Sequence, residues 1–99
     1  METEIIWSSQ AIQDLEEIHS YISRDKPIAA DRVVEGIYDT AQMLRRSPRI
    51  GWRYELIEDR EVRILLHRPY QIAYEVQTET LVEILGIYHA ARDIERLLR

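Results

Sequence analysis

The first part of the chain begins with a short polar and apolar alternation and continues with apolar residues at helical spacing. Residues 2–7 alternate weakly and end on Trp7, which predicts a short strand. Ser8 and Ser9 then supply hydroxyls that can cap the first amides of a helix. The apolar residues that follow recur every three or four positions, the spacing of one helix face. They predict a buried face made of Ala11, Ile12, Leu15, Ile18 and Ile22.

A second helix follows a break at residues 24–27. Proline is tolerated in the first turn of a helix but not in its interior, so Pro27 separates the two helices. We predict that the second helix runs to about Arg46. Its narrow apolar seam consists of Ala30, Val34, Ile37, Ala41 and Leu44. Because the connection is short, the two helices should form an antiparallel hairpin.

The pattern changes to strand-like runs after the proline and glycine of residues 47–51. Three runs rich in β-branched and aromatic residues predict strands over residues 61–67, 70–76 and 81–88. Their connections are too short for a parallel crossover, so neighbouring strands must be antiparallel. Residues 90–98 return to helical spacing and predict a short final helix.

The predicted order is therefore strand, two helices, three strands and a helix. It corresponds to an α+β fold in which a helical hairpin packs on a small, mainly antiparallel sheet. A chain of 99 residues with 45% hydrophobic content can form one core but not two. We expect a single domain over residues 1–99.

Composition excludes several classes of protein. There is no cysteine, so disulfides and thiolate metal sites are excluded. Asp31, Glu35 and Asp39 lie on one helix face but spread over about 12 Å, which favours a solvated stripe over a metal site. No glycine-rich phosphate loop is present, and no apolar run approaches the roughly 20 residues of a membrane span. The acidic start does not resemble a signal peptide. We expect a cytoplasmic protein with no metal and no cofactor.

The net charge of −5 argues against binding to nucleic acid through overall electrostatic attraction. A local basic cluster is nevertheless present, since Arg45, Arg46, Arg49 and Arg53 have no acid between them. Two of these arginines could simply interact with the partial negative charge at the C-terminal end of the second helix. The alternative is a site for a phosphate or a partner, with Trp52 as a stacking neighbour.

Cleavage of RNA by acid-base chemistry needs a base for the 2′-hydroxyl, an acid for the leaving oxygen and cations for the phosphorane. Several residues could supply the acid and the cations, namely Arg63, His67, Tyr88, His89 and Arg92. The base is missing, because Glu55, Glu58 and Glu61 are candidates only by their place in the sequence. A structural role at a strand end is the simpler explanation for each histidine. No catalytic centre can be assembled with conviction.

Four motifs in order resemble a known family. The first is Ala11…Asp14-Leu15 with its continuation to Ala30, and the second is Ser47-Pro48-Arg49-Ile50-Gly51, of the form P-x-x-G. The third is Tyr70-Gln71-Ile72-Ala73-Tyr74-Glu75-Val76, of the form Y-x-I-x-Y-x-V. The fourth, Ile87-Tyr88-His89-Ala90-Ala91-Arg92-Asp93-Ile94, is similar to an L-H-G-A-R-D ending. Together they resemble the ParE/RelE superfamily of toxins from bacterial toxin-antitoxin systems, over nearly the whole length.

The resemblance implies one of two activities. RelE-like members cut mRNA in the ribosomal A site, using arginines, lysines and a late tyrosine, or a glutamate with a C-terminal histidine-tyrosine pair. ParE-like members are associated with inhibition of DNA gyrase. Gln71 stands where RelE-like toxins often have arginine, Arg63 is not joined by a lysine pair, and a predicted helix occupies the tail. These departures and the acidity favour the ParE-like branch.

The resemblance thus predicts a toxin that inhibits DNA gyrase by protein-protein contact, arrests growth and stabilises plasmids. A cognate antitoxin would neutralise it in a hetero-oligomer, through a segment that folds on binding. The residues predicted to contact a target or partner are Arg49, Arg53, Tyr88, His89 and Arg92. One alternative is a RelE-like endoribonuclease acting on ribosome-bound mRNA, with Arg63, Tyr88, His89 and Arg92 as catalytic residues. Another is a non-toxic relic that only binds the antitoxin.

Overall fold

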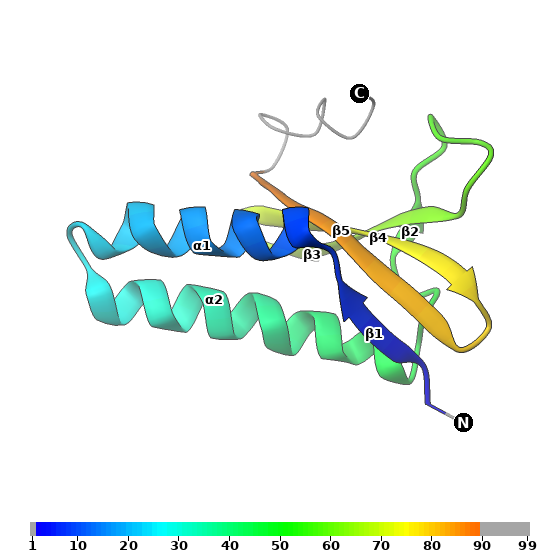
Figure 1. Ribbon diagram of the computed structural model, residues 1–99, viewed down its shortest axis with the longest axis horizontal. Coiled ribbons are helices and arrows are strands. Elements are labelled where there is room, and N and C mark those ends of the chain that lie inside the picture. The colour runs from blue at the N-terminus through cyan, green and yellow to red at the C-terminus, as the bar shows by residue number, and fades with distance from the viewer. Residues whose placement is uncertain (1, 90–99) are drawn as a thin grey trace.

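A computed structural model describes residues 2–89, and the helix predicted over residues 90–98 lies outside the described residues. The elements follow in the order β1 (Glu4–Trp7), α1 (Ser9–Ser23), α2 (Pro27–Gln42), a 3-10 turn η1 (Met43–Arg45), β2 (Trp52–Arg53), β3 (Val62–His67), β4 (Tyr70–Thr78) and β5 (Leu81–His89). Figure 1 shows the two helices as a long hairpin beside a twisted sheet. The α+β prediction is confirmed.

The sheet has five strands in the order β1-β5-β4-β3-β2. The pairs β2–β3, β3–β4 and β4–β5 are antiparallel, as the short connections require, whereas β1 pairs with β5 in parallel. Several element ends differ from the predicted bounds by one to four residues, and one strand was not predicted. The second helix ends at Gln42 and tightens into η1 instead of reaching Arg46, a common way to end a helix. β2 was not predicted, because a strand of two residues has no period to detect.

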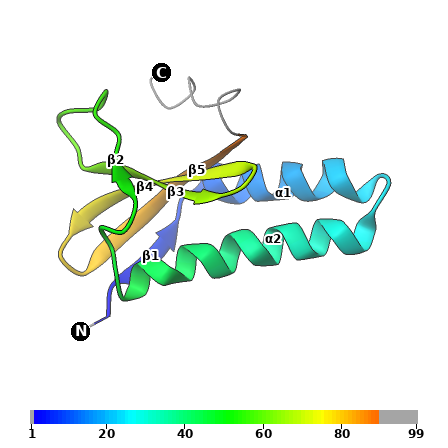
Figure 2. The same cartoon turned by 180° about the vertical axis from the view of Figure 1, so that it is seen from behind.

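The main hydrophobic core lies between the helical hairpin and one face of the sheet (Figure 2). Its largest fully buried side chains include Ile37, Leu44, Ile72, Tyr74 and Ile84. The predicted seam of the second helix is buried there, apart from the half-buried Val34. One prediction about the first helix is wrong, since Ile12 is exposed and Asp14 is buried instead. Asp14 occupies the helix face that meets β5, where its carboxylate has hydrogen-bond donors.

β5 carries a bulge that changes which face of the sheet its side chains occupy. Ala73 of β4 pairs with Gly86, but the next residue of β4 pairs with Ile84, so Leu85 is an extra residue in β5. Side chains alternate between faces along a regular strand. Because of the extra residue, Ile84 and Ile87 both contribute to the main core although they are three positions apart.

A second, smaller cluster forms on the other face of the sheet. Its buried members are Ile64, Ala73 and Tyr88, and Tyr54 and Leu85 pack against it half-buried. Ala73 lies between two β4 residues of the main core, so alternation places it on the opposite face. The bulge therefore places Tyr88 in this smaller cluster and not in the main core.

Asp14 fastens α1 to β5 directly after the bulge. The residue is only 3% exposed, and its Oδ2 accepts the backbone N–H of Ile87 at 2.9 Å. The Oδ1 accepts from the Gln10 side chain at 2.9 Å. A Cβ atom on Gly86 would stand 3.1 Å from Asp14 Oδ2 and 2.9 Å from the Tyr88 hydroxyl, so glycine leaves room for this approach.

Ser8 caps α1 and binds the bulge at the same time. Its Oγ accepts the N–H of Ala11 at 3.0 Å, as an N-cap should, and donates to the carbonyl of Leu85 at 3.0 Å. Its own N–H donates to the carbonyl of Ile84 at 3.0 Å. Ser8 thus holds the start of α1 against β5 through two hydrogen bonds that reach that strand.

α2 meets β3 through a close contact at His67. The ring packs against Gly36, and a Cβ atom on that glycine would stand only 2.8 Å from His67 Cε1. Its Nδ1 forms a hydrogen bond with the Thr40 hydroxyl at 2.9 Å. His67 therefore links an end of β3 to the second helix. Over residues 2–89, neither helix has the length and apolar character needed to cross a membrane.

We expect Asp14→Ala to destabilise the fold, because it removes a buried acceptor that joins α1 to β5. Loss of such a hydrogen bond costs about 1–3 kcal/mol, which should appear in the free energy of unfolding measured with urea. Asp39→Ala makes the same substitution at an exposed position of α2 and should change stability by less than about 0.5 kcal/mol. Equal effects of the two substitutions would show that the buried bond contributes nothing.

Candidate functional site

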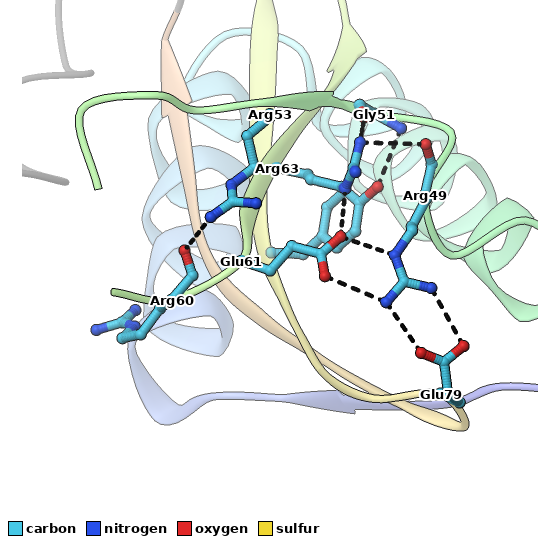
Figure 3. Close-up of polar contacts among 8 residues, drawn as sticks. Arg49, Gly51, Arg53, Arg60, Glu61, Arg63 and Glu79 are labelled. Carbon is cyan, nitrogen blue, oxygen red and sulfur yellow. Dashed lines mark hydrogen bonds and ion pairs between the residues drawn. The ribbon is translucent and has the colours of Figure 1, made fainter. Parts of the chain in front are cut away.

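Side chains of alternating charge form a chain along one side of the sheet, in the order Glu79, Arg49, Glu61 and Arg63 (Figure 3). Arg49 comes from the loop after η1, Glu61 and Arg63 from the start of β3, and Glu79 from the turn between β4 and β5. Arg49 Nε and Arg63 Nε both donate to Glu61 Oε2 at 2.8 Å. The folded chain thus brings together charges from three separate segments.

Arg63 fixes the loop from which Arg49 projects. Its NH1 donates to the carbonyl of Gly51 at 2.7 Å and, at 3.4 Å, to the carbonyl of Arg49. These bonds satisfy backbone acceptors of an irregular segment that has no ladder partner at those positions. The guanidinium of Arg63 is therefore used by the fold, and its exposed fraction is only 20%.

Gly51 and Tyr74 hold the other end of the same loop. The N–H of Gly51 donates to the Tyr74 hydroxyl at 3.0 Å in the protein interior. A Cβ on Gly51 would stand 2.5 Å from the carbonyl oxygen of Ile64, a distance that backbone atoms cannot accommodate. Burial raises the pKa of the Tyr74 phenol, so the hydroxyl stays protonated around neutral pH. The glycine is required by close approach of two backbone segments.

The ion pairs shift the pKa values of their members. The hydrogen bond from Arg49, followed by that from Arg63, lowers the pKa of the Glu61 carboxyl below its ordinary value, although partial burial opposes the change. The hydrogen bonds from Glu61 and Glu79 raise the pKa of Arg49 still further above its usual range. A carboxylate held in this way is a poor general base, because an effective base has a pKa near the working pH.

The basic cluster predicted from residues 45–53 is not a bare basic patch. Arg49 is paired with two glutamates, and Arg45 Nε donates to the Gln42 side chain at 2.6 Å. Arg53 donates to the carbonyl of Arg60 at 3.2 Å, and its Nε is buried with no hydrogen bond to any described residue. The carboxylates that neutralise Arg49 lie 12 and 30 residues away along the chain.

The end of β5 forms a separate group. Tyr88 is 5% exposed within the second cluster, a placement that suits packing better than direct contact with a partner. His89 is half-buried, and its ring meets that of Tyr70 edge-on with the centroids 5.7 Å apart. Arg92, the third predicted residue of this group, lies outside the described residues.

The two groups of predicted residues are not brought together. Arg63 pairs with Tyr74, and Tyr74 pairs with Ile84 across the sheet. Tyr88 pairs with Gln71, which lies three residues from Tyr74 along β4, and this corresponds to about 10 Å at the rise of a strand. The structure therefore joins Arg63 to Arg49 but leaves both at a distance from Tyr88 and His89.

Metal-ligating side chains do not gather in groups of three or more within residues 2–89. Asp31, the first member of the predicted acidic stripe, is bonded to His19 Nε2 at 2.7 Å. Glu35 and Asp39 are exposed on α2. The stripe has the character of a solvated helix surface.

Three residues that hold the charged site or the fold were not predicted from the sequence. Glu79 lies in the connection between the last two predicted strands, and Asp14 is a member of the first motif, with no role predicted for either. Tyr74 was noted in a strand motif without a role. A signal was present for two of them, since Asp14 and Tyr74 both belong to the motifs that resemble the toxin superfamily.

Comparison with known proteins places the chain among toxins. Residues 5–94 match the model of the family described as the ParE toxin of the type II toxin-antitoxin system parDE. The chain is 35% identical to putative toxin Y4kP of Sinorhizobium fredii, over 95% of each chain. It is also 35% identical to toxin RelE2 of Caulobacter vibrioides, over 90% of this chain and 97% of that one. A chain of the chromosomal ParDE system of P. aeruginosa has the same fold, with a TM-score of 0.76 and 23% identity over 89% of this chain and 96% of that one.

Tyr74→Phe should destabilise the protein, because it leaves the buried N–H of Gly51 without its acceptor. A cost of about 1–3 kcal/mol in the free energy of unfolding is expected. Tyr21→Phe removes the same atom from an exposed tyrosine and should have almost no effect in the same denaturation experiment. If the two variants were equally stable, the Gly51 bond would have no energetic role.

Glu61→Gln should reduce the acid sensitivity of the fold. Because the pKa of Glu61 is lowered on folding, its contribution to stability is present above its ordinary pKa of about 4.5 and is lost as the pH falls through the folded value. Urea unfolding at a series of pH values should therefore show a shallower decline below about pH 4.5 in this variant. Glu58→Gln, at an exposed position, should keep the wild-type slope. A wild-type slope in both variants would contradict this account.

Proposed function

The chain belongs to the ParE toxin family of type II toxin-antitoxin systems, and from this premise we propose that it inhibits DNA gyrase by protein-protein contact and is neutralised by a cognate antitoxin. In this proposal residues 1–99 form one toxin domain that acts in the cytoplasm, arrests growth and thereby stabilises plasmids. The family membership supports the toxin role directly. The choice of gyrase rather than the ribosome is argued from the charged side chains.

The ion pairs of the arginines are the main support for gyrase rather than the ribosome as the target. Stabilising the phosphorane formed during RNA cleavage would need cations aimed at the reacting phosphate. Arg49 and Arg63 are instead both bonded to Glu61, and Arg63 is also bonded to the loop carbonyls. Glu61 is the candidate base nearest to these arginines, and its lowered pKa makes it ill suited to take a proton from a hydroxyl.

The second candidate group also lacks features of a nuclease centre. Gln71, the residue that stands where RelE-like toxins often have arginine, pairs with Tyr88 across the β4–β5 ladder. Tyr88 is buried, and burial limits its access to a ribosome-bound RNA. These placements support a toxin that works without cleaving RNA.

Exposed apolar side chains support an action through protein contact. Both helices carry large hydrophobic residues in solvent, among them Ile12, Tyr21, Ile28 and Tyr38, and the exposed Met43 follows in η1. A contiguous apolar surface is typical of sites that bind other proteins, and in this proposal the exposed residues of the hairpin supply such a surface. The antitoxin and the target are the partners that this surface would serve, in keeping with a hetero-oligomer of toxin and antitoxin.

The test is a supercoiling assay with purified DNA gyrase, run beside a ribosome-dependent mRNA cleavage assay. We expect inhibition of supercoiling that the cognate antitoxin reverses, and no cleavage of mRNA. Codon-specific cleavage with unaffected gyrase would reject the proposal in favour of a RelE-like endoribonuclease. In that event His89→Ala and Arg92→Ala should abolish cleavage while the fold is kept.

The endoribonuclease stays as the second candidate because one relative, 35% identical to this chain, is named toxin RelE2. A relic that binds only the antitoxin is separated from both activities by growth. Induction of the protein alone should arrest growth, and co-expression of the antitoxin should restore it. Unimpaired growth on induction would point to the relic.

A further inference from the structure

The guanidinium of Arg49 is bonded on two sides by carboxylates that differ in exposure. Glu61 accepts from Nε at 2.8 Å and from NH2 at 3.2 Å. Glu79 accepts from NH1 at 3.3 Å and from NH2 at 3.2 Å, so it takes the outer edge of the fork (Figure 3). The Glu79 side chain is 83% exposed, against 21% for that of Glu61.

The two contacts differ in how firmly they are held. Glu61 also bonds Arg63, which is anchored to the carbonyls of the loop, so the inner contact is part of a network. Glu79 lies in the two-residue turn between β4 and β5. Within this network it is bonded only to Arg49. An exposed ion pair of that kind contributes about 0–1 kcal/mol. Glu79 can therefore leave while Glu61 keeps Arg49 in position.

A surface pocket adjoins this outer edge. Its lining includes Glu79 and Pro48, the neighbour of Arg49, together with Arg45 and Arg46. Two further arginines thus line the pocket that Glu79 borders. The remaining lining residues, Glu2 and Thr3, come from the chain segment before β1.

We propose that the outer edge of Arg49 is a recognition site for a carboxylate side chain of a partner protein, and that Glu79 occupies this site in the free toxin. The bidentate geometry of Glu79 is the one that an aspartate or glutamate of a partner would adopt. A polyanion such as nucleic acid fits less well, since Glu2, Glu61 and Glu79 surround the site and the chain carries a net charge of −5. The partner is thus expected to offer isolated acidic side chains.

The test measures binding of a short capped peptide that contains two glutamates. Titration followed by NMR of the arginine Nε–Hε signals reports contact at Arg49 directly. We expect Glu79→Gln to bind the peptide about two- to fivefold more tightly than wild type, the range that an exposed ion pair of up to about 1 kcal/mol corresponds to. The same peptide with glutamine in place of glutamate should not bind.

Matched variants separate recognition at Arg49 from a change in overall charge. Glu55→Gln makes the same charge change at an exposed position outside the network and should leave the affinity nearly unchanged. Adding Arg49→Gln to Glu79→Gln should abolish the gain. Arg49→Lys in the same background keeps the charge but not the fork, and should also lose the gain if the contact is bidentate. Circular dichroism checks that each variant is folded.

Three results would overturn the proposal. The first is an equal gain in Glu79→Gln and Glu55→Gln, and the second is a gain that survives both changes at Arg49. The third is tighter binding of a single-stranded oligonucleotide than of the peptide, which would assign the site to nucleic acid. The inference rests on the proposed action through protein contacts, but the titration contains no gyrase. Failure to inhibit supercoiling and failure to bind the peptide are therefore distinguishable.

Discussion

The attachment of α1 to β5 is the constraint on which the rest of the fold depends. β5 lies between β1 and β4, and its extra residue, Leu85, interrupts the regular pairing with β4. Ser8 bonds the carbonyls of Ile84 and Leu85, and Asp14 accepts the N–H of Ile87 just beyond them. Buried polar groups cost about 1–3 kcal/mol each when they are left unbonded. The bulge, the start of α1 and the parallel pairing of β1 therefore require one another.

A second set of contacts presents the charged site. The bond between Gly51 and Tyr74 holds the loop after η1 against the sheet, and Arg63 bonds the carbonyls of that loop. Arg49 then projects from a fixed backbone toward Glu61 and Glu79. Of the arginines in and around this loop, Arg49 is thus the one whose charge is balanced by two carboxylates. Recognition here depends on individual bidentate contacts, which are sensitive to geometry rather than to total charge.

The motifs that resemble the toxin superfamily coincide with contacts between distant elements. Gly51 of the P-x-x-G motif bonds Tyr74 of the Y-x-I-x-Y-x-V motif, 23 residues away. Asp14 of the opening motif bonds Ile87, the first residue of the last motif, 73 residues away. The motifs thus report how the chain folds. They indicate the fold and the family of the chain. The target of the toxin is inferred instead from exposed and charged groups.

The sequence by itself determined the two helices of the hairpin, the four strands β1, β3, β4 and β5 to within a few residues, and the antiparallel pairing of β3, β4 and β5. These features depend on spacing over a few residues or on connections too short to allow another arrangement. Only the tertiary structure decided the bulge at Leu85, the burial of Asp14 and the two glutamates that bind Arg49. Each of these joins residues that are far apart along the chain, and the apolar pattern of one segment contains no information about the polar partner it will meet. The pairing of Arg49 is of this second kind, because the two carboxylates that bind it come from other elements.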